Sequence, residues 1–140
     1  MTYSYDDYNY VIKLQKGERL SEAIEQFIQE TKIEGGWIQG LGATLEATLG
    51  FYDLEKQEYQ WRTFDGLHEL VSLNGNLAFD EQGKMMLHAH CVIADQDYQT
   101  VGGHIKDLVA GATVELFVHR TFKPLHRKLD DEVGLQTFDL

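Results

Sequence analysis

Most of the chain alternates between hydrophobic and polar residues, a pattern typical of strands that bury one face in a core. Segments rich in glycine, aspartate and other turn-forming residues interrupt this alternation. The predicted strands cover residues 8–14, 37–42, 44–53, 59–64, 68–79, 84–94 and 111–118, with a further edge strand at residues 135–138.

One segment has helical rather than strand periodicity. Its apolar residues recur three or four positions apart, while glutamates and glutamines occupy the opposite face; the apolar residues are Leu20, Ile24, Phe27 and Ile28. Gly35-Gly36 is predicted to end this helical unit. One helix with about seven strands predicts an α+β fold, in which the helix packs on a mostly antiparallel sheet. We expect residues 1–140 to form a single domain.

Several glycines are predicted to form turns. Gly40-Leu41-Gly42 resembles part of a phosphate-binding loop, but it lacks the third glycine and a following helix. We therefore interpret these glycines as serving turn geometry or close backbone packing. Asp65-Gly66 is predicted to form another turn, between two strands.

The overall charge restricts the partners that the chain can bind. Its 140 residues carry a formal net charge of −11, and 43% of them are hydrophobic, as in a folded globular protein. Binding to nucleic acid depends on basic residues that release counterions from phosphates, so this charge disfavours DNA. We predict that the basic residues near the C-terminus lie in a solvated loop; they are His119, Arg120, Lys123, His126, Arg127 and Lys128.

Three observations favour a cytoplasmic protein. Cys91 is the single cysteine, so no internal disulfide can form. The first residues lack the basic and apolar regions of a signal peptide. No apolar run approaches the roughly 20 residues needed to cross a bilayer, so we expect no membrane association.

The main chemical signal is a pair of histidines in the predicted strand 84–94. Alternation places His88 and His90 on one face, about 7 Å apart at their Cα atoms. Cys91 falls on the opposite, apolar face and is excluded as a ligand. Two imidazoles at this spacing can converge on one metal ion.

A third histidine, His104, follows Gly102-Gly103, and a turn at these glycines could bring it back to the same face. Three neutral imidazoles with an open fourth position are a known arrangement for a divalent metal, above all zinc. Glu69 is the candidate hydrogen-bond partner of a ligating histidine. The alternatives are interface or half-buried histidines without a metal, and an exposed charge at Glu69.

Several motifs, in this order and spacing, resemble the plants and prokaryotes conserved domain, known as the PPC or PCC domain. The resemblance covers nearly the whole chain and rests on segments 16–18, 38–43, 69–76, 87–90, 101–104 and 114–116. It implies an α/β sandwich built on a mixed or antiparallel sheet, and a homotrimer. It also implies a metal near the histidine motif, matched here by His88, His90 and His104.

Plant members of this family carry AT-hooks, which bind A/T-rich DNA. This chain lacks the Arg-Gly-Arg-Pro core of an AT-hook, so the plant function does not follow from the fold. We consider four functions: a metal-binding regulatory or ligand-binding trimer, a DNA-associated regulator, a metal-dependent hydrolase with Glu69 as general base, and an interaction trimer without a ligand. The resemblance names no small-molecule ligand.

Overall fold

The structure, a computed structural model, describes residues 1–140 and contains one helix and eight strands. The helix is α1 (Leu20–Thr31). The strands are β1 (Thr2–Tyr5), β2 (Asn9–Gln15), β3 (Gly36–Asp53), β4 (Glu58–Phe79), β5 (Met85–Ala94), β6 (Thr100–Arg120), β7 (Arg127–Asp130) and β8 (Leu135–Phe138).

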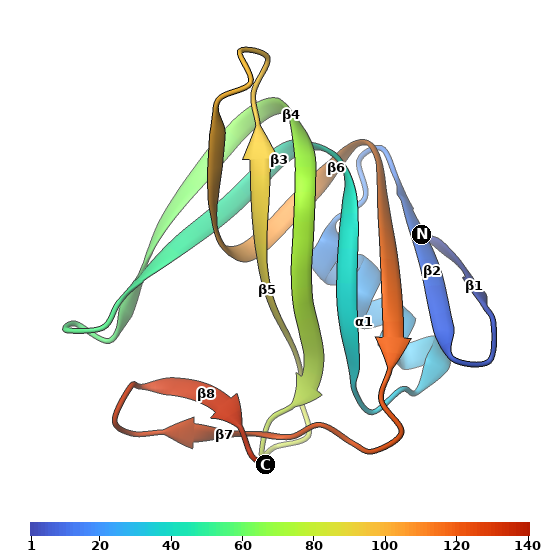
Figure 1. Ribbon diagram of the computed structural model, residues 1–140, viewed down its shortest axis with the longest axis vertical. Coiled ribbons are helices and arrows are strands. Elements are labelled where there is room, and N and C mark those ends of the chain that lie inside the picture. The colour runs from blue at the N-terminus through green and yellow to red at the C-terminus, as the bar shows by residue number, and fades with distance from the viewer.

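Six strands form one antiparallel sheet in the order β1-β2-β6-β3-β4-β5, and β5 pairs with β6 as well as with β4. This additional pairing makes β3, β4, β5 and β6 a closed ring, because each of these four strands then pairs with two of the others. Figure 1 shows the resulting curvature, and shows the separate β7–β8 hairpin (red) at the bottom of the view. The predicted α+β class with a mostly antiparallel sheet is confirmed.

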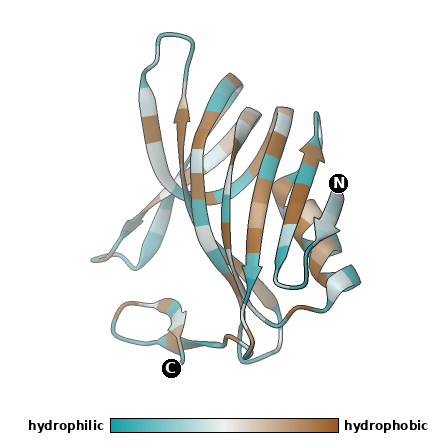
Figure 2. Cartoon of the chain, turned by 45° about the vertical axis from the view of Figure 1, so that its right-hand side comes forward, coloured by the Kyte–Doolittle hydropathy of each residue, from teal (hydrophilic) through white to brown (hydrophobic).

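Helix α1 covers one face of the sheet and closes the core. The residues predicted at its apolar face are buried, except for the half-buried Ile28 at its edge. They join sheet residues such as Ile12, Leu14 and Leu116 in a cluster of 23 buried hydrophobic residues. Figure 2 shows the alternating brown and teal bands along the strands that this one-sided burial requires. The helix is neither long nor apolar enough to span a membrane.

The glycines of Gly40-Leu41-Gly42 lie inside β3, so the turn predicted here is wrong and β3 runs on to Asp53. A Cβ atom at Gly40 would lie 2.4 Å from the Leu116 side chain, and one at Gly42 would lie 2.2 Å from the Thr113 carbonyl oxygen. Gly42 also has a φ of 146°, at a shift in the β3–β6 register. Close backbone packing, the other interpretation of this motif, is what the structure has.

Two further boundaries and one strand pairing also differ from the predictions. Gly66 has a positive φ but lies within the continuous strand β4, which joins the predicted strands 59–64 and 68–79. Residues 135–138 form β8 as predicted, but they pair with β7 rather than with the edge of the main sheet. Helix α1 ends at Thr31, where Lys32 adopts the left-handed conformation, before the two glycines expected to end it.

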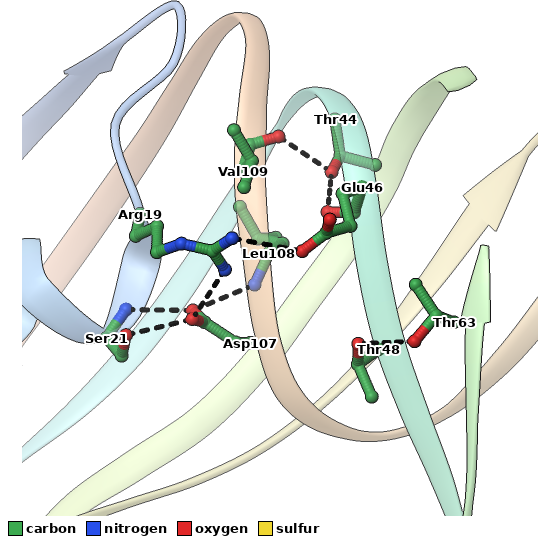
Figure 3. Close-up of polar contacts among 9 residues, drawn as sticks. All are labelled: Arg19, Ser21, Thr44, Glu46, Thr48, Thr63, Asp107, Leu108 and Val109. Atoms are coloured by element: carbon green, nitrogen blue, oxygen red, sulfur yellow. Dashed lines mark hydrogen bonds and ion pairs between the residues drawn. The ribbon is translucent and has the colours of Figure 1, made fainter. Parts of the chain in front are cut away.

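A polar network fastens the start of α1 to β6 (Figure 3). Asp107 accepts hydrogen bonds from the backbone N–H and the hydroxyl of Ser21, at 3.1 and 2.9 Å, and from Arg19 at 3.2 Å. Arg19 also donates to Glu46 on β3 at 3.2 Å. Because Arg19 makes no capping hydrogen bond with its own side chain, Asp107 supplies the acceptor that the first turn lacks.

The Asp107→Ala variant is expected to lower the free energy of unfolding by about 1–2 kcal/mol, since it removes a helix-capping acceptor and leaves neighbouring donors unpaired. Urea denaturation followed by circular dichroism measures this difference. The matched control is Asp97→Ala, which changes an exposed aspartate whose side chain makes no hydrogen bond. Equal stability of the two variants would contradict the assigned role of Asp107.

Candidate metal site

Strand pairing brings the three predicted histidines together on the sheet face opposite α1. His90 on β5 stands directly opposite His104 on β6, and His88 precedes His90 by two residues on the same face of β5. Directly paired residues of an antiparallel sheet point to the same side. The register of the β5–β6 ladder therefore positions all three rings.

The three imidazole rings lie at almost equal separations. Their centroids are 5.5 Å apart for His88 and His90, 5.3 Å for His88 and His104, and 5.4 Å for His90 and His104. One ring nitrogen from each histidine lies within 4.8 Å of the other two. Ligand nitrogens about 2.0–2.1 Å from a zinc ion would lie somewhat closer together than this, so small ring movements suffice to form a site.

Gly102 and Gly103 do not form the predicted turn. They are strand residues of β6, paired with Val92 and Cys91, and the chain reverses earlier, at residues 95–99. A Cβ atom at Gly103 would lie 2.8 Å from the carbonyl oxygen of Gly50. The glycines thus permit β6 to pack closely against both β5 and β3, which is what places His104 opposite His90.

The surroundings keep two of the histidines neutral. Burial lowers the pKa of His104 to about 4, and the nearby His88, His90 and Arg127 lower it further, because positive charge on these side chains would repel a proton on His104. Burial also lowers the pKa of His88, with further contributions from Arg127 and His90. A neutral imidazole is the form that binds a metal, so no proton has to be displaced from these two rings at neutral pH.

One atom of the cluster lacks a hydrogen-bond partner. The Nδ1 atom of His104 is buried and makes no hydrogen bond, although buried polar atoms are almost always satisfied. A metal ligand is one role that such a nitrogen can have. The residues present therefore fit a divalent metal: three imidazoles, a half-buried setting and an unpartnered ring nitrogen.

Arg127 is the residue that sequence reasoning missed. It was expected in a solvated loop, but only 4% of it is exposed, so that prediction is wrong. From the start of β7, its Nη2 donates to Oδ1 of Asn76 at 2.7 Å and contacts Nδ1 of His88 at 3.2 Å. Its Nη1 donates to the carbonyl oxygen of Gln136 at 2.7 Å. Residues 121–126 before it have no periodic pattern, so nothing in the sequence indicated its burial.

Aromatic rings line one side of the cluster. The Tyr59 ring lies 4.7 Å and the Trp61 ring 6.0 Å from the ring of His104. Gly50 on β3 pairs with Trp61 on one side and with His104 on the other. A Cβ atom at Gly50 would lie 2.6 Å from the Trp61 ring. On the other side, exposed His90 borders a shallow hollow of about 390 Å³. The cluster is therefore accessible from solvent and has an apolar wall.

The remaining candidates lie away from this cluster. Cys91 is buried on the core face, as predicted, and burial raises the pKa of its thiol to about 11. Glu69 pairs with Ala94, four residues along β5 from His90, and makes no hydrogen bond to a histidine; its role beside the site stays a prediction. His68 and His119 make their own polar contacts with Gly66 and Asn9.

A curved antiparallel sheet with one covering helix and a three-histidine cluster on its other face defines an α+β domain with a candidate metal site. The chain belongs to the Plants and Prokaryotes Conserved (PCC) domain family, which matches residues 1–121. The resemblance inferred from the sequence motifs is thereby confirmed.

Solved structures share the fold over almost the whole chain. A proposed DNA-binding protein from Bacteroides thetaiotaomicron is 25% identical, with a TM-score of 0.93 over 99% of this chain and 96% of that one. A metal-containing protein from Archaeoglobus fulgidus is also 25% identical, with a TM-score of 0.86 over 100% of this chain and 99% of that one.

A curated relative, the bifunctional protein GlmU of Synechococcus sp., is 26% identical over 98 residues. These are 69% of this chain but only 14% of the relative.

The lowered pKa of His104 predicts a pH dependence for the metal-free protein. Between about pH 6.5, the ordinary histidine value, and about pH 4, the unfolded chain binds a proton at this position that the folded chain does not. The free energy of unfolding should therefore be highest above this window and should fall as the pH decreases through it. The His104→Gln variant should show a smaller fall in urea denaturation at several pH values. An unchanged slope in that variant would contradict the assignment.

Proposed function

We propose that this protein is a metal-binding, homotrimeric module that serves regulation or ligand binding, with one zinc ion held by His88, His90 and His104. The observation that carries the proposal is the convergence of one nitrogen from each ring within 4.8 Å. The unpartnered Nδ1 atom of His104 and the similarity to the metal-containing protein from Archaeoglobus fulgidus support this proposal.

The donor set favours a transition metal such as zinc over magnesium or calcium. Imidazole nitrogen suits zinc, copper, iron and nickel, whereas magnesium and calcium prefer the oxygen donors that this cluster lacks. Three protein ligands leave one position of a tetrahedral zinc ion open for an external ligand. Such sites also occur in hydrolases. Glu69, the candidate base, pairs with Ala94, which lies about 13 Å along β5 from His90. A base at that distance is poorly placed to act at the cluster, so ligand binding is the better-supported function.

DNA association has less support. The relative from Bacteroides thetaiotaomicron is a proposed DNA-binding protein. However, the net charge of −11 opposes binding to phosphates, and the buried Arg127 removes one cation from the basic group near the C-terminus. The same charge attracts metal cations.

The metal proposal predicts about one zinc ion per chain in the native protein, measured by elemental analysis after dialysis against metal-free buffer. His88→Ala, His90→Ala and His104→Ala should each reduce zinc affinity at least about tenfold, because two imidazoles hold zinc less well than three. His68→Ala, which alters a histidine outside the cluster, is the control and should bind normally. The proposal would be refuted if the native protein held less than about 0.2 zinc ions per chain and if the His88→Ala variant bound zinc as the native protein does.

The trimer is supported by apolar side chains exposed on the same face of the sheet as the histidines. Val11, Leu41, Val71 and Phe117, from four different strands, line a shallow hollow of about 480 Å³ and are 43–57% exposed. The pairing register runs from Val11 through Phe117, Gln39 and Asn74 to His90. Contiguous exposed apolar surface is typical of association sites, so the cluster would lie close to a subunit boundary.

The Leu41→Asp variant should dissociate the assembly, because it places a charge in the centre of this apolar surface. Light scattering after size exclusion is expected to give three times the mass of one chain for the natural protein and one chain mass for the variant. Leu54→Asp, in the exposed turn between β3 and β4, is the matched control and should stay trimeric. A natural protein that is monomeric at all concentrations would exclude the trimer.

A further inference from the structure

The chemistry of Arg127 points to the kind of molecule that the histidine site binds; this inference rests on the proposed metal site. Arg127 is a buried cation without a carboxylate partner, because its three hydrogen-bond contacts go to Asn76, His88 and a backbone carbonyl. None of the ion pairs of the protein includes it. A buried charge that is not neutralised is costly, which favours an anion at this place.

Arginine has five N–H donors, and the contacts of Arg127 use three of them. The buried Nε is one of the atoms without a partner. A buried polar group without a partner destabilises a protein, so this guanidinium has unused capacity to donate to a ligand.

Metal binding would release a further donor. The Nη2 group of Arg127 contacts Nδ1 of His88 at 3.2 Å, and this contact needs the single lone pair that a neutral imidazole carries on its ring nitrogens. A metal on His88 needs the same lone pair. If it binds Nδ1 it replaces the arginine, and if it binds Nε2 the proton moves to Nδ1 and faces the N–H of Arg127. Ligation by His88 and the hydrogen bond from Arg127 therefore exclude each other.

A metal in the site would then leave a divalent ion, a guanidinium with released donors and three neutral imidazoles close together. An anion that occupies the open metal position and accepts from Arg127 would neutralise this charge and satisfy these donors. The neighbouring rings indicate that the anion has an organic part. Tyr59 and Trp61 lie beside His104 and offer an apolar surface, whereas the Phe138 ring already packs on the guanidinium, whose Cζ lies 4.4 Å from the ring centroid.

We propose that the metal-loaded cluster binds a small organic carboxylate, with one carboxylate oxygen on the metal and Arg127 as the residue that recognises its charge. A planar carboxylate matches the fork of an arginine, and the aromatic wall suits the hydrocarbon part of such a ligand. The exposed side of His90 gives it access from solvent.

Cobalt(II) in place of zinc makes the test visible, since its absorption spectrum reports the ligands of the metal. Propionate should change the spectrum of the cobalt-loaded protein, whereas propionamide, the neutral molecule of the same shape, should not. In Arg127→Met the propionate dissociation constant should rise about tenfold or more, the effect of losing one charge-assisted hydrogen bond. Without propionate, the same variant should bind cobalt more tightly, because the competing cation is gone.

A second variant separates recognition from a purely structural role of Arg127. Asn76→Asp keeps the acceptor that holds Arg127 in place but gives the guanidinium a carboxylate partner. It should bind cobalt normally or more tightly and propionate more weakly. If Arg127 only fastened the β7–β8 hairpin, this substitution would leave propionate affinity unchanged, and that result would overturn the proposal.

The outcomes distinguish the two proposals. Cobalt uptake that His88→Ala abolishes, combined with equal responses to propionate and propionamide, would refute the carboxylate proposal and leave the metal site intact. Sulfate binding more tightly than propionate would also refute it, since the ligand would then be an inorganic oxyanion. Failure of the natural protein to take up cobalt or zinc would refute the metal site and this inference together.

Discussion

The pairing of β5 with β6 is the interaction on which the rest of the structure depends. Strand β6 spans Thr100–Arg120 and pairs with β5, β3 and β2 along its length. This one strand therefore closes the ring and also connects the ring to β2 in the part of the sheet that α1 covers. To reach three neighbours it has to bend and approach them closely, which requires glycines where a Cβ atom would contact backbone. The same pairing brings His104 opposite His90. Closure of the sheet and assembly of the candidate site are therefore one event.

The two faces of the closed sheet have different roles, one in stability and one in the candidate site. The face under α1 holds the buried cluster that stabilises the domain, including Ala89 between the two histidines of β5 and Cys91 directly after them. The opposite face holds exposed apolar side chains at one end of a row of paired residues and the histidines at the other. Because strand residues alternate, the sequence of β5 serves both faces at once, and neither set can change its register without moving the other.

Local periodicity explains which features the sequence predicted. Alternation is a property of neighbouring residues, so it correctly placed His88 and His90 on one face of the strand and Cys91 on the opposite face. The glycine interpretations failed because a glycine looks the same whether it allows a turn or allows another strand to come near. Gly42 and Gly103 serve strands that are distant in the sequence. Arg127 was missed for the same reason, since its burial depends on Asn76 and His88, about 50 and 40 residues away.

Because the chain is acidic, a buried cation such as Arg127 matters for the binding of any anion. A net charge of −11 attracts metal cations and repels anions, so an anionic ligand would approach this surface against the overall field. Surface lysines or arginines could offset that field only weakly, because water and salt screen exposed charges. A guanidinium that is buried beside the three histidines is screened far less. Together with the charge of a bound metal, it would make the site locally attractive to an anion within an acidic protein, and this is the physical reason to look for the ligand among small carboxylates rather than among nucleic acids.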